Sequence, residues 1–488
     1  MSTAPMSTAD PLLSKEQLRQ MAQMAIRISA SDSVSVEMQH QARAVTRIAN
    51  NTILTSDSGS ALTISMITRA GARNTVVFRT NWADESMLRS AVARLDAITR
   101  EQVGGAEDYF HVPDAPQSYM PVHLWHDSTV QAMGTVNETV VPQLIRDLRA
   151  AGFRGSGFVG LMAQRSCVMK KEGLSTYGEQ TDSECTVSAR TPDGKASGWY
   201  GQANRDWTKI QPGDIAAKAI DIAKRSVNAE AIEPGRRTAI LSPFAVAQVM
   251  HHLSQGFDAY LTNVLHATVF TVTGNLDRNN KIGLRVMDPR LSITSDPADP
   301  EGGYFPFGVV WDGDGSGMPT RAMTYVEGGI LRDLSYHINY GLDQGKPFTQ
   351  NPWSMRMSAM PGVPLQTMDE MIAHCDEGIY VHRFGNIEQV NSVTGLQTGV
   401  TRDGCFLIKH GKIDRPVKNF RFTDSPMFFL NRLIAIGVPE RIALGFTPPS
   451  IMPTIMEPPY ASDWPRRPMI VPPIMVTDFN FTSLSDAV

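Results

Sequence analysis

Cysteine is scarce in this chain of 488 residues, which contains four, and no two of them form a CxxC pair. Four cysteines in a chain of this length make no disulfide framework, so the sequence favours a reducing compartment. No apolar run approaches the ~18 residues of a membrane-spanning helix. The N-terminus lacks the basic and apolar regions of a secretory signal. These absences predict a soluble, cytoplasmic protein with no membrane partner.

An excess of charge of one sign is also missing. Lys and Arg number 45 against 49 Asp and Glu, which gives a formal net charge of −4. The basic residues are scattered and form no patch in the sequence, which argues against a nucleic-acid partner. An apolar share of 42% with 19% charged residues fits a globular chain with a sizeable core. The length predicts about two to four domains.

Helical and strand-like patterns follow one another in blocks along the chain. They predict a disordered tail, an N-terminal α+β domain, a linker, a central α+β domain and a β-rich C-terminal domain, over residues 1–13, 14–103, 104–122, 123–235 and 236–488. The expected fold class is α+β. It consists of an N-terminal two-layer α/β region followed by a β-rich C-terminal domain of mixed, barrel-like sheets.

Several helix boundaries can be predicted from capping residues. Ser14 with Gln17 three residues later is a capping box that begins a helix. Gly152 occupies the usual left-handed position after a helix that starts near residue 140. Ser242 and Pro243 open a helix that runs to about Ser254. A last helical pattern covers residues 427–436.

Strands are expected between these helices. A strand pattern spans Ala44 to Ile53, and Asn50-Asn51 within it could turn the chain or form a bulge. Short strand patterns also cover residues 157–163, 167–171, 186–190 and 197–202. Pro192-Asp193-Gly194 predicts a hairpin turn between the last two.

Two motifs that suggest ligands are explained better by backbone turns. Gly155–Gly160 matches GxGxxG, but a dinucleotide site needs a strand before the motif and a helix after it. Here the order is reversed, so the glycines are interpreted as the entry into a strand. Asp312 to Ser316 resembles the start of a calcium loop, yet the closing Glu position is taken by Met323.

Eleven histidines raise the question of a metal site. His251 and His252 lie on the helix opened by Pro243, but adjacent helical residues point about 100° apart and cannot share a face. Gln255 and Gly256 stand four residues on, where a second ligand would be needed. His123 and His126 lie in a segment that looks extended. Cys405 is flanked by an apolar run and is expected to be a small buried residue.

A family resemblance emerges when short segments are taken together in chain order. They are Arg47–Asn51, Gly152–Phe158, Gly173-Leu174 with Tyr177, Thr181 and Asp182, Ser197–Trp199, Ala239–Pro243, Asp296-Pro297, Asp299-Pro300, Val326–Gly329, Thr398–Ile408, Gly411–Ile413, Pro416–Phe422 with Ser425, Val471–Pro473 and Asp478–Ser483. In this order they resemble the TldD/PmbA family, whose proteolytic member is a zinc peptidase. The resemblance runs from about residue 40 to the end of the chain.

The resemblance also implies a role within that family. Its TldD-like branch carries HExxxH on a helix of the C-terminal domain, whereas the PmbA-like branch, also called TldE, lacks it. The matching helix here reads VMHHLSQGF from Val249, and HExxxH occurs nowhere in the chain. We therefore carry over no catalytic residue, cofactor or metal ligand. The resemblance implies a partner subunit with HExxxH and zinc, and a joint action on unfolded peptides or precursor peptides.

Two alternatives stay open at this stage. One is an active metallopeptidase with rearranged ligands, drawn from His251 or His252, His266, and further from His123, His126 or Cys405. Stoichiometric zinc in the isolated chain would support it. The other is a peptide-binding scaffold that has no peptidase partner, which the absence of any co-purifying protein would favour.

Overall fold

The computed structural model describes most of the chain. The described residues are 11–70, 74–80, 84–101, 115–272, 279–308, 317–349, 352, 354–442 and 468–485. Of the predicted disordered tail only residues 11–13 fall within these ranges, and of the predicted linker only 115–122. The calcium-like segment Asp312–Ser316 lies outside them. No helix among the described residues is long and apolar enough to cross a membrane.

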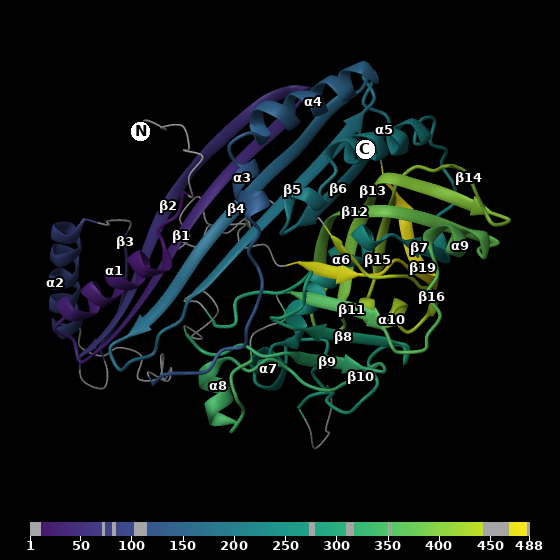
Figure 1. Ribbon diagram of the computed structural model, residues 1–488. Helices are drawn as coiled ribbons and strands as arrows, with labels where there is room; N and C mark the ends of the chain where they lie inside the picture. Colours follow the sequence, from purple (N-terminus) through teal and green to yellow (C-terminus); the bar gives the residue numbers. More distant parts are fainter. Residues whose placement is uncertain are drawn as a thin grey trace.

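One long antiparallel sheet forms the N-terminal part (Figure 1). Its strand order is β3-β2-β1-β4-β5-β6. The strands are β1 (Ser33–Ala49), β2 (Thr52–Ala70), β3 (Asn74–Thr80), β4 (Arg154–Lys170), β5 (Gly178–Arg190) and β6 (Ser197–Asn204). β1 precedes residues 104–122 in the chain and β4 follows them, and the two strands pair from Ser35 to Ile48 of β1. One sheet therefore contains strands from before and after this segment.

Helices cover one face of the long sheet. They are α1 (Lys15–Ile28), α2 (Glu85–Glu101), α3 (Asp127–Ala132), α4 (Val136–Ala150) and α5 (Pro212–Arg225), with a short 3-10 turn η1 (Trp207–Lys209). Residues of β1 alternate between buried and half-buried, as a strand with one covered face should. Val36 packs with the α1 and α2 core, and Ala42 and Ile48 pack with the α4 and α5 core.

A closed five-stranded barrel lies in the C-terminal part. Hydrogen bonds run from β12 to β7, β19, β15, β13 and back to β12. These strands are β7 (Gly235–Leu241), β12 (Glu377–Asn391), β13 (Leu396–Lys409), β15 (Phe420–Asp424) and β19 (Ile474–Leu484), with β14 (Lys412–Pro416) and β16 (Leu433–Ile436) attached to β13 and β19. The predicted α+β class with a barrel-like C-terminal domain is confirmed.

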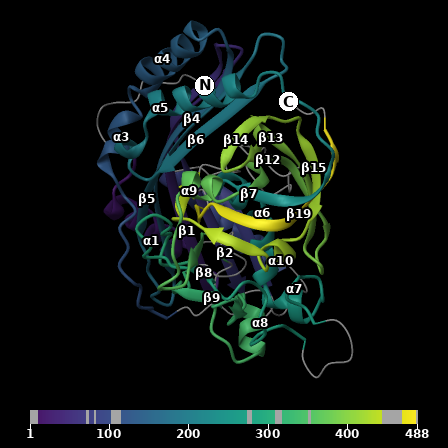
Figure 2. The ribbon, with the colours of Figure 1, turned by 90° about the vertical axis from the view of Figure 1, so that its right-hand side faces the viewer.

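A third sheet lies beside the barrel, in the order β10-β9-β8-β11-β18-β17. It contains β8 (Leu291–Ser295), β9 (Met323–Glu327), β10 (Ile330–Leu331), β11 (Met355–Ala359), β17 (Glu440–Ile442) and β18 (Met469–Val471). The accompanying helices are α6 (Pro243–Ser254), η2 (Gln255–Phe257), α7 (Ala259–Asn263), α8 (Ile338–Asp343), α9 (Met368–Ala373) and α10 (Pro426–Phe429). Figure 2 shows α6 among β7 and β19 of the barrel. One hydrophobic core joins α6 to the barrel and the third sheet.

Most of the predicted boundaries are confirmed. Ser14 and Gln17 form a capping box at the start of α1, and Gly152 has the left-handed φ of 78° that ends α4. The glycines of the GxGxxG match lie inside β4, as the strand interpretation expects. The hairpin turn at Pro192-Asp193-Gly194 joins the antiparallel strands β5 and β6.

Two secondary-structure predictions are wrong. The single strand predicted over Ala44–Ile53 is two strands, although the turn that was one of the two interpretations of Asn50-Asn51 is confirmed. These residues adopt φ of 49° and 59° and reverse the chain between β1 and β2. The helix predicted over residues 427–436 stops at Phe429, and Leu433–Ile436 form strand β16 on β19. Pairing with β19 satisfies the backbone there, so tertiary contacts override the helical pattern.

Candidate functional site

Helix α6 occupies the position where the family resemblance places the zinc motif. Ser242 caps it by accepting hydrogen bonds from the backbone N–H of Phe244 and Ala245, and its own hydroxyl donates to the His382 carbonyl. Pro243 at the first turn suits a helix start. Eight of its residues are buried: Pro243, Phe244, Ala245, Val246, Ala247, Val249, Met250 and Leu253. A helix that is apolar on nearly all sides is a core element.

A glutamine fixes α6 to the barrel. The Gln248 side chain donates to the Phe384 carbonyl at 2.9 Å and accepts from the Phe384 N–H at 2.8 Å. Phe384 belongs to β12 and is fully buried against Phe422 and Phe479. The position of α6 is therefore set by paired hydrogen bonds to a buried strand, which leaves little freedom for the helix to rotate.

The histidines proposed as metal ligands do not converge. His251 and His252 lie in the last turn of α6, half-buried, with ring centroids 5.7 Å apart in an edge-on arrangement. His266 is exposed and has a left-handed φ of 51°. In the part of the chain that the structure describes, no three His, Cys, Asp or Glu side chains gather as metal ligands would. The residues present do not fit a zinc site, which needs three protein ligands and an open position.

The other candidate ligands lie elsewhere in the fold. His126 precedes α3, where its Nδ1 is 4.0 Å from the Asp206 carboxylate. Cys405 is buried in β13, and burial raises the pKa of its thiol to about 12. A thiol with a raised pKa is a poor nucleophile and a poor metal ligand. The expectation that Cys405 is a small buried residue is confirmed. The rearranged ligand set drawn from His251, His252, His266, His123, His126 and Cys405 is not brought together.

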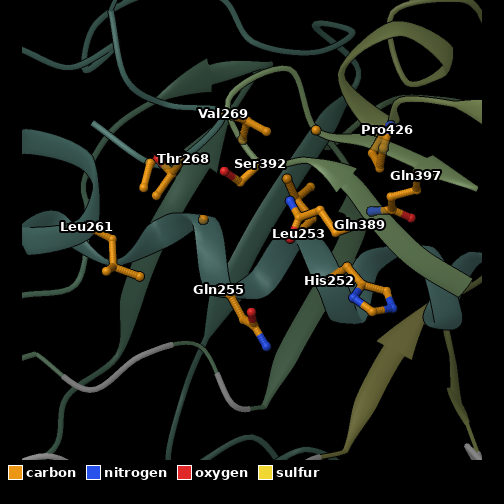
Figure 3. A pocket seen from close by; sticks show the side chains of 13 residues that line it. His252, Leu253, Gln255, Leu261, Thr268, Val269, Gln389, Ser392, Gln397 and Pro426 are labelled. Atoms are coloured by element: carbon orange, nitrogen blue, oxygen red, sulfur yellow. The ribbon is translucent and has the colours of Figure 1, made fainter. Parts of the chain in front are cut away.

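A pocket with a mixed polar and apolar lining opens at the C-terminal end of α6 (Figure 3). It has an empty volume of about 460 Å³. The polar side chains that line it come from α6 and its extension, from the β12–β13 hairpin, and from the segment before Val269; they are His252, Gln255, Thr268, Gln389, Ser392 and Gln397. Of these residues, only His252 was a candidate ligand in the sequence analysis. The glutamines lie far apart in the chain, so the sequence gives no sign that they line one pocket.

The described residues that line the pocket carry no formal charge near neutral pH. Among the described residues that line it there is no Asp, Glu, Lys or Arg. Burial lowers the pKa of His252, so its imidazole is neutral near pH 7. Gln397 is 1% exposed and donates from Nε2 to the Val249 carbonyl at 3.2 Å, while its Oε1 has no hydrogen-bond partner among the described residues. Such a lining suits amide groups better than ions.

His382, which was not among the candidates from the sequence, connects the barrel to the long sheet. His382 is 4% exposed in β12. Its Nε2 lies 2.8 Å from the Trp199 carbonyl, and its Nδ1 lies 3.1 Å from the Tyr380 hydroxyl. Burial lowers the pKa of His382 to about 4, so it is neutral, with Nε2 donating and Nδ1 accepting. Its only sequence signal is a histidine inside an apolar strand pattern.

A cluster of ionic groups reinforces the same junction between the sheets. Asp182 of β5 accepts from Arg441 of β17 at 2.8 Å. Arg205, just after β6, donates to the carbonyls of Thr181 and Gly303. Burial, and then the nearby Arg441, lower the pKa of Arg205 to about 10, and it remains protonated. These contacts bind the long sheet to the C-terminal part and position the pocket-bearing region against it.

Comparison with known proteins identifies a family and several structures that this chain resembles. Residues 234–483 match the PmbA/TldA metallopeptidase C-terminal domain. No curated protein matches the chain. Among solved structures, TldE from Thermococcus kodakarensis is similar at 14% identity and a TM-score of 0.73, covering 95% of this chain and 99% of its own.

Two further structures are similar over nearly their whole length. A protein from Thermotoga maritima, described as a proposed modulator of a DNA gyrase, has 14% identity, a TM-score of 0.72, and covers 96% of this chain and 99% of its own. A protein of the same description from Bacteroides thetaiotaomicron has 15% identity, a TM-score of 0.70, and the same coverages. These likenesses give the fold, and the match over residues 234–483 gives the family. The chain is a member of the PmbA/TldD metallopeptidase family.

Proposed function

We propose that this chain is the PmbA/TldE-like, non-catalytic subunit of a two-chain zinc peptidase that degrades unfolded peptides or trims precursor peptides. The observation that carries the proposal is the sequence and burial of helix α6. Its matching sequence has no HExxxH, and eight of its residues are buried in the core. Peptide hydrolysis at a metal needs a base beside the bound water.

Zinc is assigned to an HExxxH-bearing homologue as partner. The three histidines that could be considered in this chain, His251, His252 and His266, do not form a ligand set, so no chemical step is routed through them. What this chain supplies is binding. The uncharged amide groups of Gln389 and Gln255 at the pocket can donate to and accept from the backbone of an extended peptide. Substrate positioning of this kind raises the rate of a reaction that occurs in the partner.

The experiment is a reconstitution from separated chains. This chain and an HExxxH homologue from the same organism are co-expressed, one of them tagged, and then purified together and apart. The proposal expects the two chains to co-purify, and peptidase activity on an unfolded peptide to need the homologue and to be stopped by a chelator. Full activity of this chain alone, with chelator sensitivity, would overturn the proposal in favour of rearranged ligands.

The scaffold alternative gives a different result in the same experiment. If this chain binds unfolded peptide but neither retains the HExxxH homologue nor changes its activity, it is a peptide-binding protein without a peptidase partner. A matched control is the co-expression of the homologue with an unrelated tagged protein. Retention of the homologue by this chain and not by the control supports the two-chain enzyme.

A further inference from the structure

One buried side chain at the α6 pocket has an unused hydrogen-bonding atom. Gln397 of β13 lines the pocket and is 1% exposed, whereas Gln255 and Gln389, which also line it, are exposed. Gln397 therefore forms the base of the pocket, and the other two glutamines form its rim. The Gln397 Oε1 is buried and has no hydrogen-bond partner among the described residues. A buried acceptor without a partner is uncommon in a folded protein, and it marks a position that suits a ligand with a donor.

The orientation of the Gln397 amide is fixed by a neighbouring backbone group. Its Nε2 donates to the Val249 carbonyl of α6 at 3.2 Å. Turning the amide over would place Oε1 against that carbonyl, and two acceptors would then face each other without a hydrogen. The backbone is fixed as well, because Gln397 pairs with Gln389 of β12 on one side and with Asp424 of β15 on the other. The free acceptor is thus held in place before any ligand arrives.

The rest of the lining indicates which donor-bearing group fits. Two lining side chains offer donors without a charge: the Ser392 hydroxyl and the imidazole of His252, whose pKa is lowered by burial. The apolar part of the lining is Leu253, Leu261, Ala267, Val269 and Pro426 (Figure 3). A lining that combines apolar surface with uncharged donors and one fixed acceptor matches a short aliphatic stem that ends in a carboxamide.

Other side chains of similar length match this lining less well. A glutamate carboxylate has only acceptors, so it would meet the Gln397 Oε1 without a hydrogen between them. A lysine ammonium can donate, but the described lining has no carboxylate to offset the loss of its hydration. A methionine side chain fits the apolar part and leaves the Oε1 unpaired. Glutamine alone among the four combines an apolar stem, a donor, an acceptor and the absence of charge.

We propose that the α6 pocket is a subsite for the carboxamide side chain of a glutamine within an extended peptide. The carboxamide NH2 donates to the Gln397 Oε1, and its carbonyl accepts from Ser392 or His252. The exposed amides of Gln389 and Gln255 hold the peptide backbone at the rim. The inference rests on the proposed function, because it takes the ligand to be a peptide. Free glutamine has the same carboxamide, but its ammonium and carboxylate find no counter-charge on the described lining.

Peptide binding to the full chain alone, measured by fluorescence anisotropy, tests the subsite. The labelled peptides are extended and identical except at one central position, which is Gln, Glu, Lys or Met. The Gln peptide should bind about tenfold more tightly than each of the others, because it alone satisfies the buried acceptor without adding a charge. Free glutamine should compete at least about 100-fold more weakly than the unlabelled Gln peptide. Equal affinities for the four peptides, no binding of any of them, or equal competition by free glutamine would overturn the proposal.

Variants of the chain locate the preference at this pocket. Gln397→Met removes the acceptor at similar volume, so it should abolish the preference for the Gln peptide over the Met peptide. Gln389→Glu adds a carboxylate at the exposed rim, so it should tighten binding of the Lys peptide about threefold and weaken binding of the Glu peptide, even if Gln397→Met does not fold. Gln344→Glu, exposed after α8, is the matched control and should change neither. A Gln preference retained in Gln397→Met, or equal effects of the two charge variants, would contradict the assignment.

The binding assay also separates this inference from the proposed function, because it needs no partner subunit. If the reconstituted two-chain enzyme is active but the four peptides bind this chain equally, the subsite is wrong and the proposed function stands. If this chain prefers the Gln peptide but does not co-purify with the HExxxH homologue, the two-chain enzyme is wrong and the subsite stands.

Discussion

Asp182 and Arg441 form an ion pair of 2.8 Å in which the side chains are 2% and 5% exposed. The two residues belong to β5 and β17, so the pair crosses from the long sheet to the third sheet. A buried pair gains little over an apolar pair of the same shape, but removal of one partner leaves an uncompensated charge. The junction between the N-terminal and C-terminal parts should therefore be sensitive to single substitutions here.

Asp182→Asn is expected to lower the free energy of unfolding by about 3 kcal/mol, because Arg441 would then be buried without the carboxylate that pairs with it. Urea denaturation monitored by tryptophan fluorescence measures the change. Glu85→Gln breaks the exposed i,i+4 pair with Arg89 and should cost no more than about 0.5 kcal/mol. Equal losses in the two variants would show that the buried pair is no more important than a surface pair.

The buried His382 predicts a defined pH dependence of stability. Its pKa is about 4 in the folded chain and about 6.5 when unfolded, so the unfolded state binds the proton first. The stabilising contribution is complete above pH 6.5 and is lost as the pH falls towards 4. Between pH 7.5 and pH 5 this amounts to about 2 kcal/mol. His252 adds to the loss with the same sign, because burial lowers its pKa too.

The contribution of His382 is isolated by comparing variants. His382→Gln should be less stable at pH 7.5 but should lose about 2 kcal/mol less than the unmodified chain on going to pH 5. His252→Gln, at the pocket, should keep most of the pH dependence. Denaturation curves at both pH values decide the matter. If His382→Gln lost as much stability between pH 7.5 and pH 5 as the unmodified chain, other groups would be the cause of the pH dependence.

The link between α6 and the barrel can be tested at Gln248. Gln248→Ala removes the acceptor of the buried Phe384 N–H and leaves the Phe384 carbonyl with only the longer hydrogen bond from Arg383 Nε, and should cost about 2 kcal/mol. Gln143→Ala on the exposed side of α4 is the matched control and should change stability by less than about 0.5 kcal/mol. Thermal unfolding of both variants gives the comparison. A neutral Gln248→Ala would mean that packing alone holds α6 in place.

The proposed role of the pocket predicts a kinetic effect in the two-chain enzyme. Gln389 is exposed on the β12–β13 hairpin, so Gln389→Ala should leave folding and co-purification intact. Loss of one hydrogen bond to a peptide should raise KM about twofold to tenfold with little change in kcat. Gln344→Ala, exposed after α8, is the control. An unchanged KM in Gln389→Ala would remove the pocket from substrate binding.

Helix starts could be predicted from the sequence, because they depend on interactions between neighbouring residues. The Ser14 capping box and the Ser242-Pro243 helix start depend on neighbouring residues and are confirmed. The short segments 157–163 and 167–171 belong to one strand, β4, because pairing with β1 and β5 carries the backbone through polar residues. The pocket could not be predicted, since Gln255 and Gln389 meet only through the barrel. The burial of His382 likewise depends on Trp199 of β6, far away in the sequence.

The most direct test of the central claim is the zinc content of this chain purified alone, after incubation with zinc and gel filtration, measured beside the HExxxH homologue treated in the same way. The account predicts about one zinc per homologue chain, well below stoichiometric zinc in this chain, and no change in either value with His252→Ala in this chain. One zinc per molecule of this chain, lost in His251→Ala or His252→Ala, would contradict it.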